Sequence, residues 1–369
     1  MMARRSFACS LALAVGLAAA SSCAAGVAAG VPPAAAEAAV PRYAHVFVVM
    51  EENKGYEEIL GEQHAPTIAR LAKTYGNATR FYGEVHPSEG NYVALVGGDT
   101  YGIQDDDAFY CKPGSAEAGC PNARWKPGYR THAIDAPHLG TQLAAAGLTW
   151  KGYYESLPGP GSKAVTAGDP ALDADAALYA SKHSGFMNFI SVQNDPDRIE
   201  HIVGFDRLDA DLESGDLPAF ALVVPNQCND MHGLLAPKLP ADCAFTNGSA
   251  LIRRGDRALA TIVEKIQRSR AWTSVENVAI VISFDEDARG AREGCCGVEP
   301  ASSANFGGGH IPTIVVTNHG PRGVSDDTPY NHYSLLRTLE EAFGIRQYLG
   351  HAGDEAQGVR PMTPLFRTR

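Results

Sequence analysis

The feature that most constrains the fold is a regular alternation of short apolar runs with helical patterns. Four runs are apolar at nearly every position, and they lie at 44–50, 219–224, 278–284 and 311–317. Runs of this kind predict strands that are buried on both faces, which is typical of mostly parallel sheets. The expected fold class is therefore α/β, with a mostly parallel central sheet and helices on both faces.

Helical patterns occupy the stretches between these runs. They lie at 66–75, 137–146, 205–213, 251–269 and 331–343, and a further strand-like run lies at 148–154. Pro66 stands at the first position of its pattern, where proline is tolerated in a helix. Residues 102–130 and 286–309 are rich in Gly, Pro and Cys and lack periodicity, so we expect long loops there. No internal repeat is found in the sequence.

The first 40 residues have the composition of an export signal followed by a small-residue linker. Arg4 and Arg5 precede an apolar run at 11–20, and residues 1–36 contain no acidic residue. The pair resembles a twin-arginine export motif, while Cys23 lies in a poor lipoprotein cleavage box. We favour plain export over a lipid anchor at Cys23. Residues 41–369 are then expected to form a single catalytic domain.

The charge and hydropathy of the chain exclude some classes of protein. The chain has 42 acidic and 31 basic residues and a formal net charge of −11. A protein that binds mainly nucleic acid needs a basic surface, so this balance argues against that class. No apolar stretch after residue 40 reaches the roughly 20 residues that cross a bilayer, so no transmembrane segment is expected in the mature chain.

Cysteine usage agrees with export. Six cysteines follow the signal: Cys111, Cys120, Cys228, Cys243, Cys295 and Cys296. Six cysteines allow 15 pairings, and the sequence alone does not select one. Proximity favours two short loops, 111–120 and 228–243, and leaves the adjacent pair. The alternative is a thiolate metal site, which the spacing disfavours because no pair has the two-residue gap of a zinc knuckle.

Polar residues cluster where the predicted strands end. The residues concerned are Glu52, Asn53, Asp230, His232, Asp285 and Glu286, and His310 immediately precedes the last strand. In open α/β sheets, ligands bind beyond the carboxyl ends of the strands. Any one of these side chains alone would usually be a helix cap or a solvated turn. Several carboxylates in one cleft repel each other unless a cation neutralises them, so the coincidence predicts a divalent metal ion.

Ser88 is the candidate nucleophile. It follows a loop and precedes a helix-like stretch within HPSEGNYVALVGG, so its hydroxyl would lie at a helix N-terminus, where anions are favoured. The alternative is that Ser88 is only an N-cap. No G-x-S-x-G motif is present in the sequence, which disfavours a metal-free serine hydrolase. Coordination to a cation would instead activate a hydroxyl.

Six segments occur in an order that resembles a known family. They are VVMEENKGYEEILG, HPSEGNYVALVGG, VPNQCNDMHG, VISFDED, GGGHIPTIVVTNHGPRG and NHYSLLRTLEEAFGI, and they span 46–345. Together they resemble the phosphoesterase family that contains secreted bacterial acid phosphatases and phospholipases C, a branch of the alkaline phosphatase superfamily. Their joint order is much more specific than any single segment.

The resemblance assigns roles to individual residues. It implies that Ser88 attacks phosphorus and that Asn91 contacts the phosphate. It implies that one metal ion is bound by Glu52, Asn53, Asp285 and Glu286. Asp230, His232 and His310 match the ligands of a second ion in two-metal members, but Glu286 replaces a histidine of those enzymes. Without a second ion, these three residues would instead contact phosphate or protonate the leaving group. For His183 and His332 the resemblance allows a structural or a functional role.

The sequence thus predicts an exported, metal-dependent phosphoric-monoester hydrolase with a serine nucleophile. Its partner would be a phosphate ester, including a phospholipid head group such as a phosphoinositide. A phosphodiesterase or phospholipase C is the first alternative, disfavoured because such members generally carry extra C-terminal domains. A non-catalytic extracellular binding protein on the same fold is the second alternative, and a binder would not need Ser88.

Overall fold

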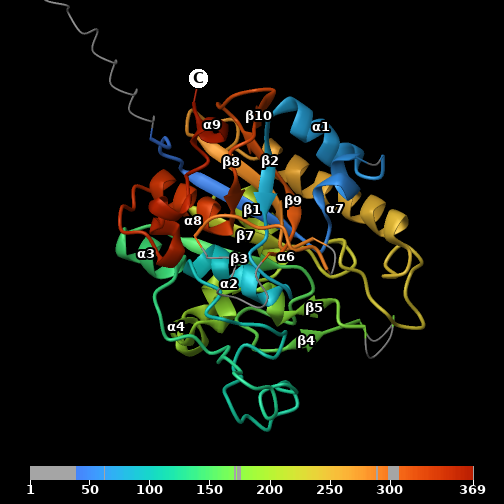
Figure 1. Ribbon diagram of the computed structural model, residues 1–369. Coiled ribbons are helices and arrows are strands. Elements are labelled where there is room, and N and C mark those ends of the chain that lie inside the picture. Colours follow the sequence, from blue (N-terminus) through green and yellow to red (C-terminus); the bar gives the residue numbers. More distant parts are fainter. Residues whose placement is uncertain are drawn as a thin grey trace, which may run out of the picture. The chain divides into compact units, whose positions relative to one another are not determined.

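The computed structural model describes residues 39–368 apart from Glu62, 170–171, 173–175, 288–289 and 298–306. The expected export motif and Cys23 lie outside the described residues. From Ala39 onward the chain forms one compact unit built around a central sheet (Figure 1).

The central sheet is mixed, with most of its strand pairs parallel. Its order is β10 (Val324–Asp326), β2 (Gly76–Tyr82), β9 (His310–Thr317), β8 (Val278–Phe284), β1 (His45–Glu51), β7 (Phe220–Val224), β3 (Trp150–Tyr154) and β6 (Ile202–Val203), and β11 (Tyr330–Asn331) also pairs with β2. β1 lies between β8 and β7 and is parallel to both. A separate antiparallel pair is formed by β4 (Thr166–Ala167) and β5 (Tyr179–Ala180).

β9 departs from the parallel pattern, and this departure positions the site. It runs antiparallel to both β8 and β2. Its first residue, His310, therefore lies at the same rim of the sheet as the carboxyl ends of β1, β7 and β8. In a parallel strand the same residue would lie at the opposite rim. β2 runs in the direction of β8, so the chain that leaves β2 also reaches this rim just before Ser88.

Helices cover both faces of the sheet (Figure 1). One group packs together as α1 (Pro66–Thr74), α6 (Phe205–Ser214) and α7 (Gly248–Arg268), and another as α2 (Glu89–Gly97), α3 (Leu139–Ala145) and α8 (His332–Ala342). Shorter helices are α4 (Ile190–Asn194), α5 (Arg198–His201) and α9 (Thr363–Phe366), and single turns lie at Glu57–Gly61, Ser181–His183, Phe186–Asn188, Gly350–Gly353 and Glu355–Gln357. No helix among the described residues is long and apolar enough to span a membrane.

The strands and helices predicted from the sequence are confirmed, with ends that shift by up to three residues. β8 occupies the predicted range, and its seven residues are all buried, as are the five of β7. Burying each large apolar side chain contributes on the order of 1.5–3 kcal/mol, so these strands anchor the core. β2 is not predicted from the sequence, because GNATRFY has no continuous apolar run.

The three disulfides that proximity favours are present. Cys111 pairs with Cys120, Cys228 with Cys243, and Cys295 with its neighbour Cys296. The first closes part of the long loop between α2 and α3, and the second closes the loop that contains His232. Disulfides persist in oxidising compartments, so their presence is typical of an extracytoplasmic protein.

Candidate active site and metal centre

The ends of three neighbouring strands are joined by backbone hydrogen bonds. The backbone N–H of Glu52 donates to the carbonyl oxygen of Asp230 at 2.7 Å, which joins the segments after β1 and β7. The N–H of Asn53 donates to Oδ1 of Asp285 at 2.9 Å, which joins those after β1 and β8. Asn53 has a φ of 50°, a left-handed conformation that asparagine tolerates better than most residues. The rim residues of β1, β7 and β8 are thus held together.

Ser88 lies at the start of α2, but its side chain does not cap the helix. No hydrogen bond joins its hydroxyl to the first backbone N–H groups of α2. Its Oγ instead lies 3.2 Å from Oε2 of Glu52, 3.4 Å from Oδ1 of Asn53 and 3.4 Å from Oε1 of Glu286. The hydroxyl is therefore surrounded by the side chains that the sequence predicts as metal ligands, which the N-cap alternative does not explain.

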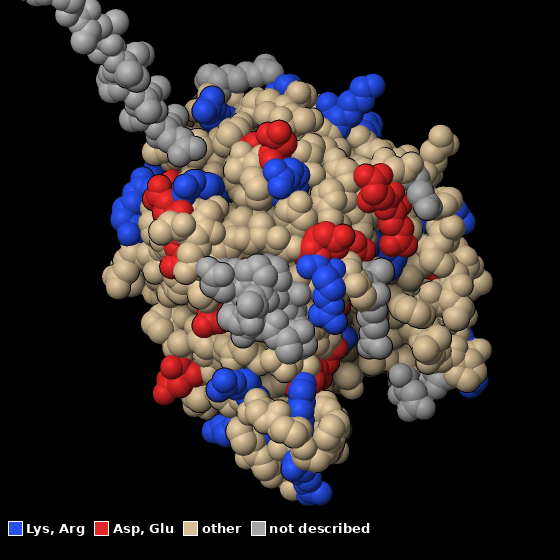
Figure 2. All heavy atoms as spheres, viewed as in Figure 1, with Lys and Arg blue, Asp and Glu red and all other residues tan. Residues whose placement is uncertain are grey.

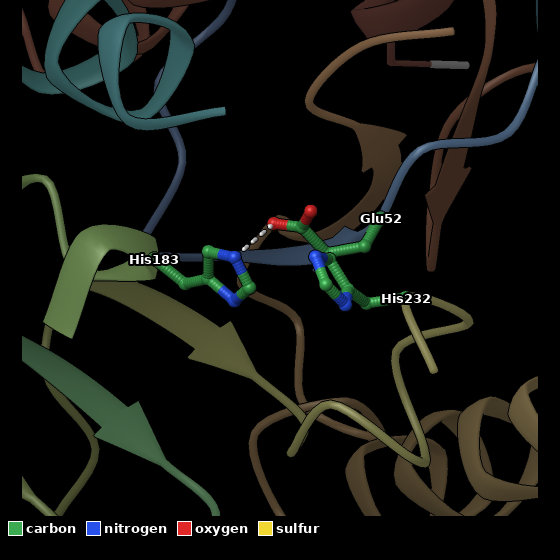
Figure 3. A group of neighbouring side chains, drawn as sticks. All are labelled: Glu52, His183 and His232. Carbon is green, nitrogen blue, oxygen red and sulfur yellow. Dashed lines mark ion pairs between the residues drawn. The ribbon is translucent and has the colours of Figure 1, made fainter. Parts of the chain in front are cut away.

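The second oxygen of Glu52 faces a pair of histidines (Figure 3). Its Oε1 accepts a hydrogen bond from the hydroxyl of Tyr92 at 2.5 Å and lies 3.3 Å from Nε2 of His183. Glu52, His183 and His232 each offer one ligand atom, and these atoms lie within 4.8 Å of one another. Glu52 is fully buried, and it links this group to the oxygen-rich group around Ser88.

His232 presents an unprotonated nitrogen to this group. Its Nδ1 lies 2.7 Å from the carbonyl oxygen of Gly233, so Nδ1 carries the proton and donates it to that oxygen. Burial, and then the positive charge of Lys182, lower the pKa of His232 to about 4. Burial, again assisted by Lys182, also lowers the pKa of His183 well below its usual range. Both rings are neutral near neutral pH, which suits metal ligands.

Burial and mutual repulsion both disfavour the ionised forms of the carboxyl groups at the rim. Burial, and then the negative charges of Asp285 and Asp230, raise the pKa of Glu52 well above its usual range. Burial raises the pKa of Asp285 and Asp230 in the same direction. The pKa of Glu286 rises to about 7, mainly through burial and against the effect of His86.

A divalent cation fits these residues. Oδ2 of Asp285 and Oδ2 of Asp230 are buried without a hydrogen-bond partner among the described residues, and the latter lies 3.7 Å from Nδ1 of His183. Buried polar atoms are nearly always paired, so each such atom requires an explanation. Carboxylate and amide oxygens are the donors that hard divalent ions prefer, and imidazoles suit borderline ions such as zinc.

Lysine and histidine side chains that the sequence analysis did not select also border the site. Nζ of Lys182 donates to Oδ2 of Asp106 at 2.9 Å, and Nζ of Lys54 donates to the carbonyl oxygen of Asn53 at 3.0 Å. Nδ1 of His86 forms an ion pair with Oε2 of Glu286 at 2.5 Å. His86 stands two residues before Ser88, and Lys182 directly precedes His183. The signal in the sequence that could have identified His86 and Lys182 is that each stands within two residues of a residue already selected.

The side chains of Asn91 and His310, two further candidates from the sequence, bind other parts of the protein. The amide oxygen of Asn91 accepts from the N–H groups of Glu84 and Val85 at 2.9 and 3.1 Å, so Asn91 holds the loop before Ser88. Its contact with phosphate stays a prediction. His310 lies 2.9 Å from the carbonyl oxygen of Thr79 through Nε2 and stacks on Tyr56, and the structure does not bring it to the metal-ligand candidates.

His332 has a structural environment. Its Nδ1 lies 2.5 Å from Oε2 of Glu84, and its Nε2 lies 2.9 Å from the carbonyl oxygen of Phe284. Both ring nitrogens are therefore occupied by protein partners. Of the two histidines whose role the sequence left open, His183 belongs to the candidate metal group and His332 ties α8 to the end of β8.

Comparison with solved structures supports the assignment of the fold. The chain is similar to a protein in the alkaline phosphatase superfamily from Vibrio parahaemolyticus, with a TM-score of 0.50, 16% sequence identity, and coverage of 83% of this chain and 68% of that chain. It is also similar to a sulfatase from Pseudoalteromonas sp., with a TM-score of 0.50, 10% identity, and coverage of 88% and 72%. The chain shares the α/β fold of these structures, so the predicted fold class is confirmed.

The chain belongs to the phosphoesterase family, whose model matches residues 62–346. It is 30% identical to a phosphatidylinositol-3-phosphatase from Mycobacterium tuberculosis over 84% of this chain and 80% of that protein. It is 26% identical to a probable acid phosphatase from Kluyveromyces lactis and to an acid phosphatase from Aspergillus fumigatus. The chain spans only 61% and 54% of those two fungal proteins. The prediction of a hydrolase that acts on phosphoric ester bonds is confirmed.

Proposed function

We propose that the protein is an exported, metal-dependent phosphoric-monoester hydrolase that uses Ser88 as its nucleophile. The observation that carries the proposal is the position of the Ser88 hydroxyl. It stands at a helix start without capping the helix, 3.2 Å from Glu52 and 3.4 Å from both Asn53 and Glu286. A binding protein has no need of a hydroxyl in this place.

Glu52, Asn53, Asp285 and Glu286 would hold the metal ion, and Asp230, His183 and His232 are candidates for a second position. When bound, the ion would lower the pKa of the serine hydroxyl and offset negative charge on the phosphate. The unpartnered oxygen of Asp285 and the crowding of the carboxyl groups support this assignment.

The covalent chemistry is a pair of displacements at phosphorus. Oγ of Ser88 forms a bond to phosphorus, loses its proton, and the bond between phosphorus and the ester oxygen breaks. The alcohol leaves after it takes up a proton. Water then attacks phosphorus, the Oγ–P bond breaks, and inorganic phosphate leaves while Ser88 regains its proton. Each displacement inverts the configuration, so the net outcome is retention.

The chain's own residues would position the phosphoryl group. Backbone N–H groups at the start of α2 favour an anion at Ser88. The positive charge of Lys182 lies close enough to lower the pKa of His232, and it would also attract the substrate. The neutral ring of His232 fits a ligand or a hydrogen-bond partner, and its role as a proton donor to the leaving group stays a prediction.

The preference for monoesters rests on the relatives. The similar proteins named above are a phosphatidylinositol-3-phosphatase and acid phosphatases. A phosphodiesterase or phospholipase C activity remains the alternative outcome of the test. Export is supported by the basic and apolar N-terminal segment and by three disulfides.

The test is a substrate panel run with and without divalent ions. The purified protein is stripped with a chelator and then supplied with Mg²⁺, Ca²⁺, Mn²⁺ or Zn²⁺. We expect hydrolysis of an aryl phosphate monoester and of a phosphoinositide, loss of activity in chelator, and recovery with at least one ion. Faster hydrolysis of the matching diester or of phosphatidylcholine would favour the phospholipase alternative. Full activity after exhaustive stripping would exclude the metal-dependent mechanism.

A further inference from the structure

A cavity of about 580 Å³ opens beside the candidate nucleophile. One side is formed by His86 and Pro87, which immediately precede Ser88 in the chain. A second part of the lining comes from the long loop between α2 and α3, which projects at the bottom of Figure 1 in teal, and a third part comes from Gly290 and Arg292. Asp106 of this loop accepts a hydrogen bond from the backbone N–H of Glu89 at 3.4 Å, so the lining contacts the residues on both sides of Ser88 in the chain. The alcohol of an ester bound at Ser88 would extend toward this cavity.

The loop wall of the cavity is braced from within. The disulfide Cys111–Cys120 closes the loop, and the carboxylate of Asp107 accepts hydrogen bonds from the side chain of Asn122 at 2.7 Å and the backbone of Ala123 at 3.1 Å. Nζ of Lys126 donates to Oδ2 of Asp105 at 2.7 Å. The wall is therefore formed before a ligand binds, as in most small-molecule sites.

The wall carries an aromatic platform. Trp125 is 69% exposed, the largest exposed aromatic side chain among the described residues. Its indole N–H donates to the carbonyl oxygen of Pro121 at 2.7 Å. The polar atom of the ring is thus satisfied inside the loop, and the remaining ring surface is apolar and available to a ligand. Such a surface favours contact with a flat or C–H-rich face.

The other lining groups are hydrogen-bonding groups, and one of them is a cation. Asp105, Asp106, Gln104, Asn122 and Arg292 line the cavity. Asp105 is paired with Lys126, and Asp106 with Lys182 at 2.9 Å. Acidic and basic side chains also lie next to each other where this loop meets the rest of the surface (Figure 2). Carboxylate, amide and guanidinium groups all form hydrogen bonds with hydroxyl groups, and this polar lining does not suit an acyl chain.

We propose that this cavity binds the alcohol part of the substrate and that this alcohol is a hydroxyl-rich ring, a sugar or a cyclitol. Trp125 stacks on the C–H face of the ring, and Asp105, Asp106 and the amides accept or donate hydrogen bonds to its hydroxyl groups. The proposal rests on the proposed function, because it requires that phosphorus is bound at Ser88. It names Trp125 as a residue that determines specificity without taking part in the chemical step.

The test compares two classes of monoester in the Trp125→Ala variant. The ring substrates are glucose 1-phosphate and myo-inositol 1-phosphate, and the substrate without a ring is ethyl phosphate. We expect KM for the ring substrates to rise about tenfold with kcat changed by less than about twofold, while the kinetics with ethyl phosphate stay unchanged. Phe245→Ala is the matched control, because Phe245 is also exposed, at 55%, and does not line the cavity.

Gln104→Ala provides a second variant in the same wall, and it should weaken binding of the ring substrates in the same direction. Unchanged KM for both ring substrates in both variants would overturn the proposal. Adenosine monophosphate separates a sugar site from a base site: a larger KM effect on it than on the ring substrates would also overturn the proposal. A wild-type enzyme that hydrolyses no monoester at all would instead contradict the proposed function, so the two failures are distinguishable.

Discussion

Two buried glutamate–histidine pairs lie at the same rim of the sheet, and they differ in what remains unpaired. In the Glu84–His332 pair, both carboxylate oxygens and both ring nitrogens have protein partners. In the Glu52–His183 pair, the histidine lies 3.3 Å from one carboxylate oxygen, and the other oxygen faces Ser88. The first pair is complete as a structural link, whereas the second belongs to a group in which Nε2 of His183 and Oδ2 of Asp285 have no hydrogen-bond partner among the described residues.

Two helix starts show the same contrast. Asn331 precedes α8, and its side chain accepts a hydrogen bond from the N–H of Ser334 at 3.1 Å, which is an ordinary cap. Ser88 precedes α2 and makes no such bond. A side chain that leaves its helix end uncapped in order to face carboxylates is better explained by chemistry than by stability. Both comparisons, of the two glutamate–histidine pairs and of the two helix starts, therefore separate a structural role from a functional one.

The largest expected effect is on kcat, and it distinguishes a substitution at the start of α2 from one at the start of α8. Ser88→Ala should reduce kcat by more than about 1000-fold, because the covalent route is lost, while the melting temperature changes little. Asn331→Ala should do the reverse: it should cost about 1 kcal/mol of stability and leave kcat within a few-fold of wild type. Steady-state kinetics and thermal melts of both variants make the comparison. A folded Ser88→Ala protein with more than about a tenth of the wild-type rate would contradict it.

The next effect concerns the end of β8. Asp285→Asn should lower kcat by more than about 100-fold, because it removes a charge from the metal-ligand candidates. Asp287 lies two residues further along, where its side chain packs against Gly55 and Gly309. Asp287→Asn is nearly isosteric and should change kcat little. Equal losses in the two variants, measured at saturating metal, would show that the ligand assignment is wrong.

The two glutamate–histidine pairs should respond in opposite directions when each carboxylate becomes an amide. Glu84→Gln breaks a buried, fully partnered pair and should destabilise the protein by roughly 3–5 kcal/mol. Glu52→Gln removes a carboxylate that is repelled by Asp285 and Asp230, so in the absence of metal the melting temperature should stay level or rise. Denaturant unfolding in chelator checks this. A large loss of stability in Glu52→Gln would mean that this group is structural as well.

A smaller effect is expected from pH, at a site outside this comparison. Burial alone would lower the pKa of His132, but its hydrogen bonds to Asp105 and Glu89 raise it to about 10. A raised folded-state pKa contributes stability that is complete below the unfolded value of about 6.5 and is lost as pH rises through about 10. The melting temperature should therefore fall between pH 7 and pH 10. His132→Gln should flatten this dependence, and an unchanged slope would remove His132 as its cause.

The sequence predicts the fold well because the deciding strands are apolar at nearly every position. β1, β7 and β8 read as continuous buried runs, and the polar residues that follow them mark the rim. β2 is not predicted because its residues form no clear apolar face. Its place in the sheet depends on pairing with β9, which is distant in the sequence. Local patterns do not contain such long-range pairings.

The positions of the ligand candidates could be predicted from the sequence, whereas the residues around them could be predicted less well. Glu52, Asn53, Asp285 and Glu286 follow strands directly, so their convergence on Ser88 was expected. The ring of Tyr92 and the charge of Lys182 reach the site only through the folding of α2 and the turn at Ser181–His183. His310 lies at the rim as expected, yet its ring is held by Tyr56 and Thr79, which depends on side-chain packing.

The most direct test of the account is the detection of a phosphoryl group on Ser88 during turnover. The protein is mixed with an aryl phosphate monoester, quenched with acid and digested, and the peptide that contains Ser88 is analysed by mass spectrometry. The account predicts a phosphorylated Ser88 in the wild-type protein, no such peptide in Ser88→Ala, and retention of configuration at a chiral phosphorus. Inversion at phosphorus, or full turnover with Ser88 absent, would contradict the account.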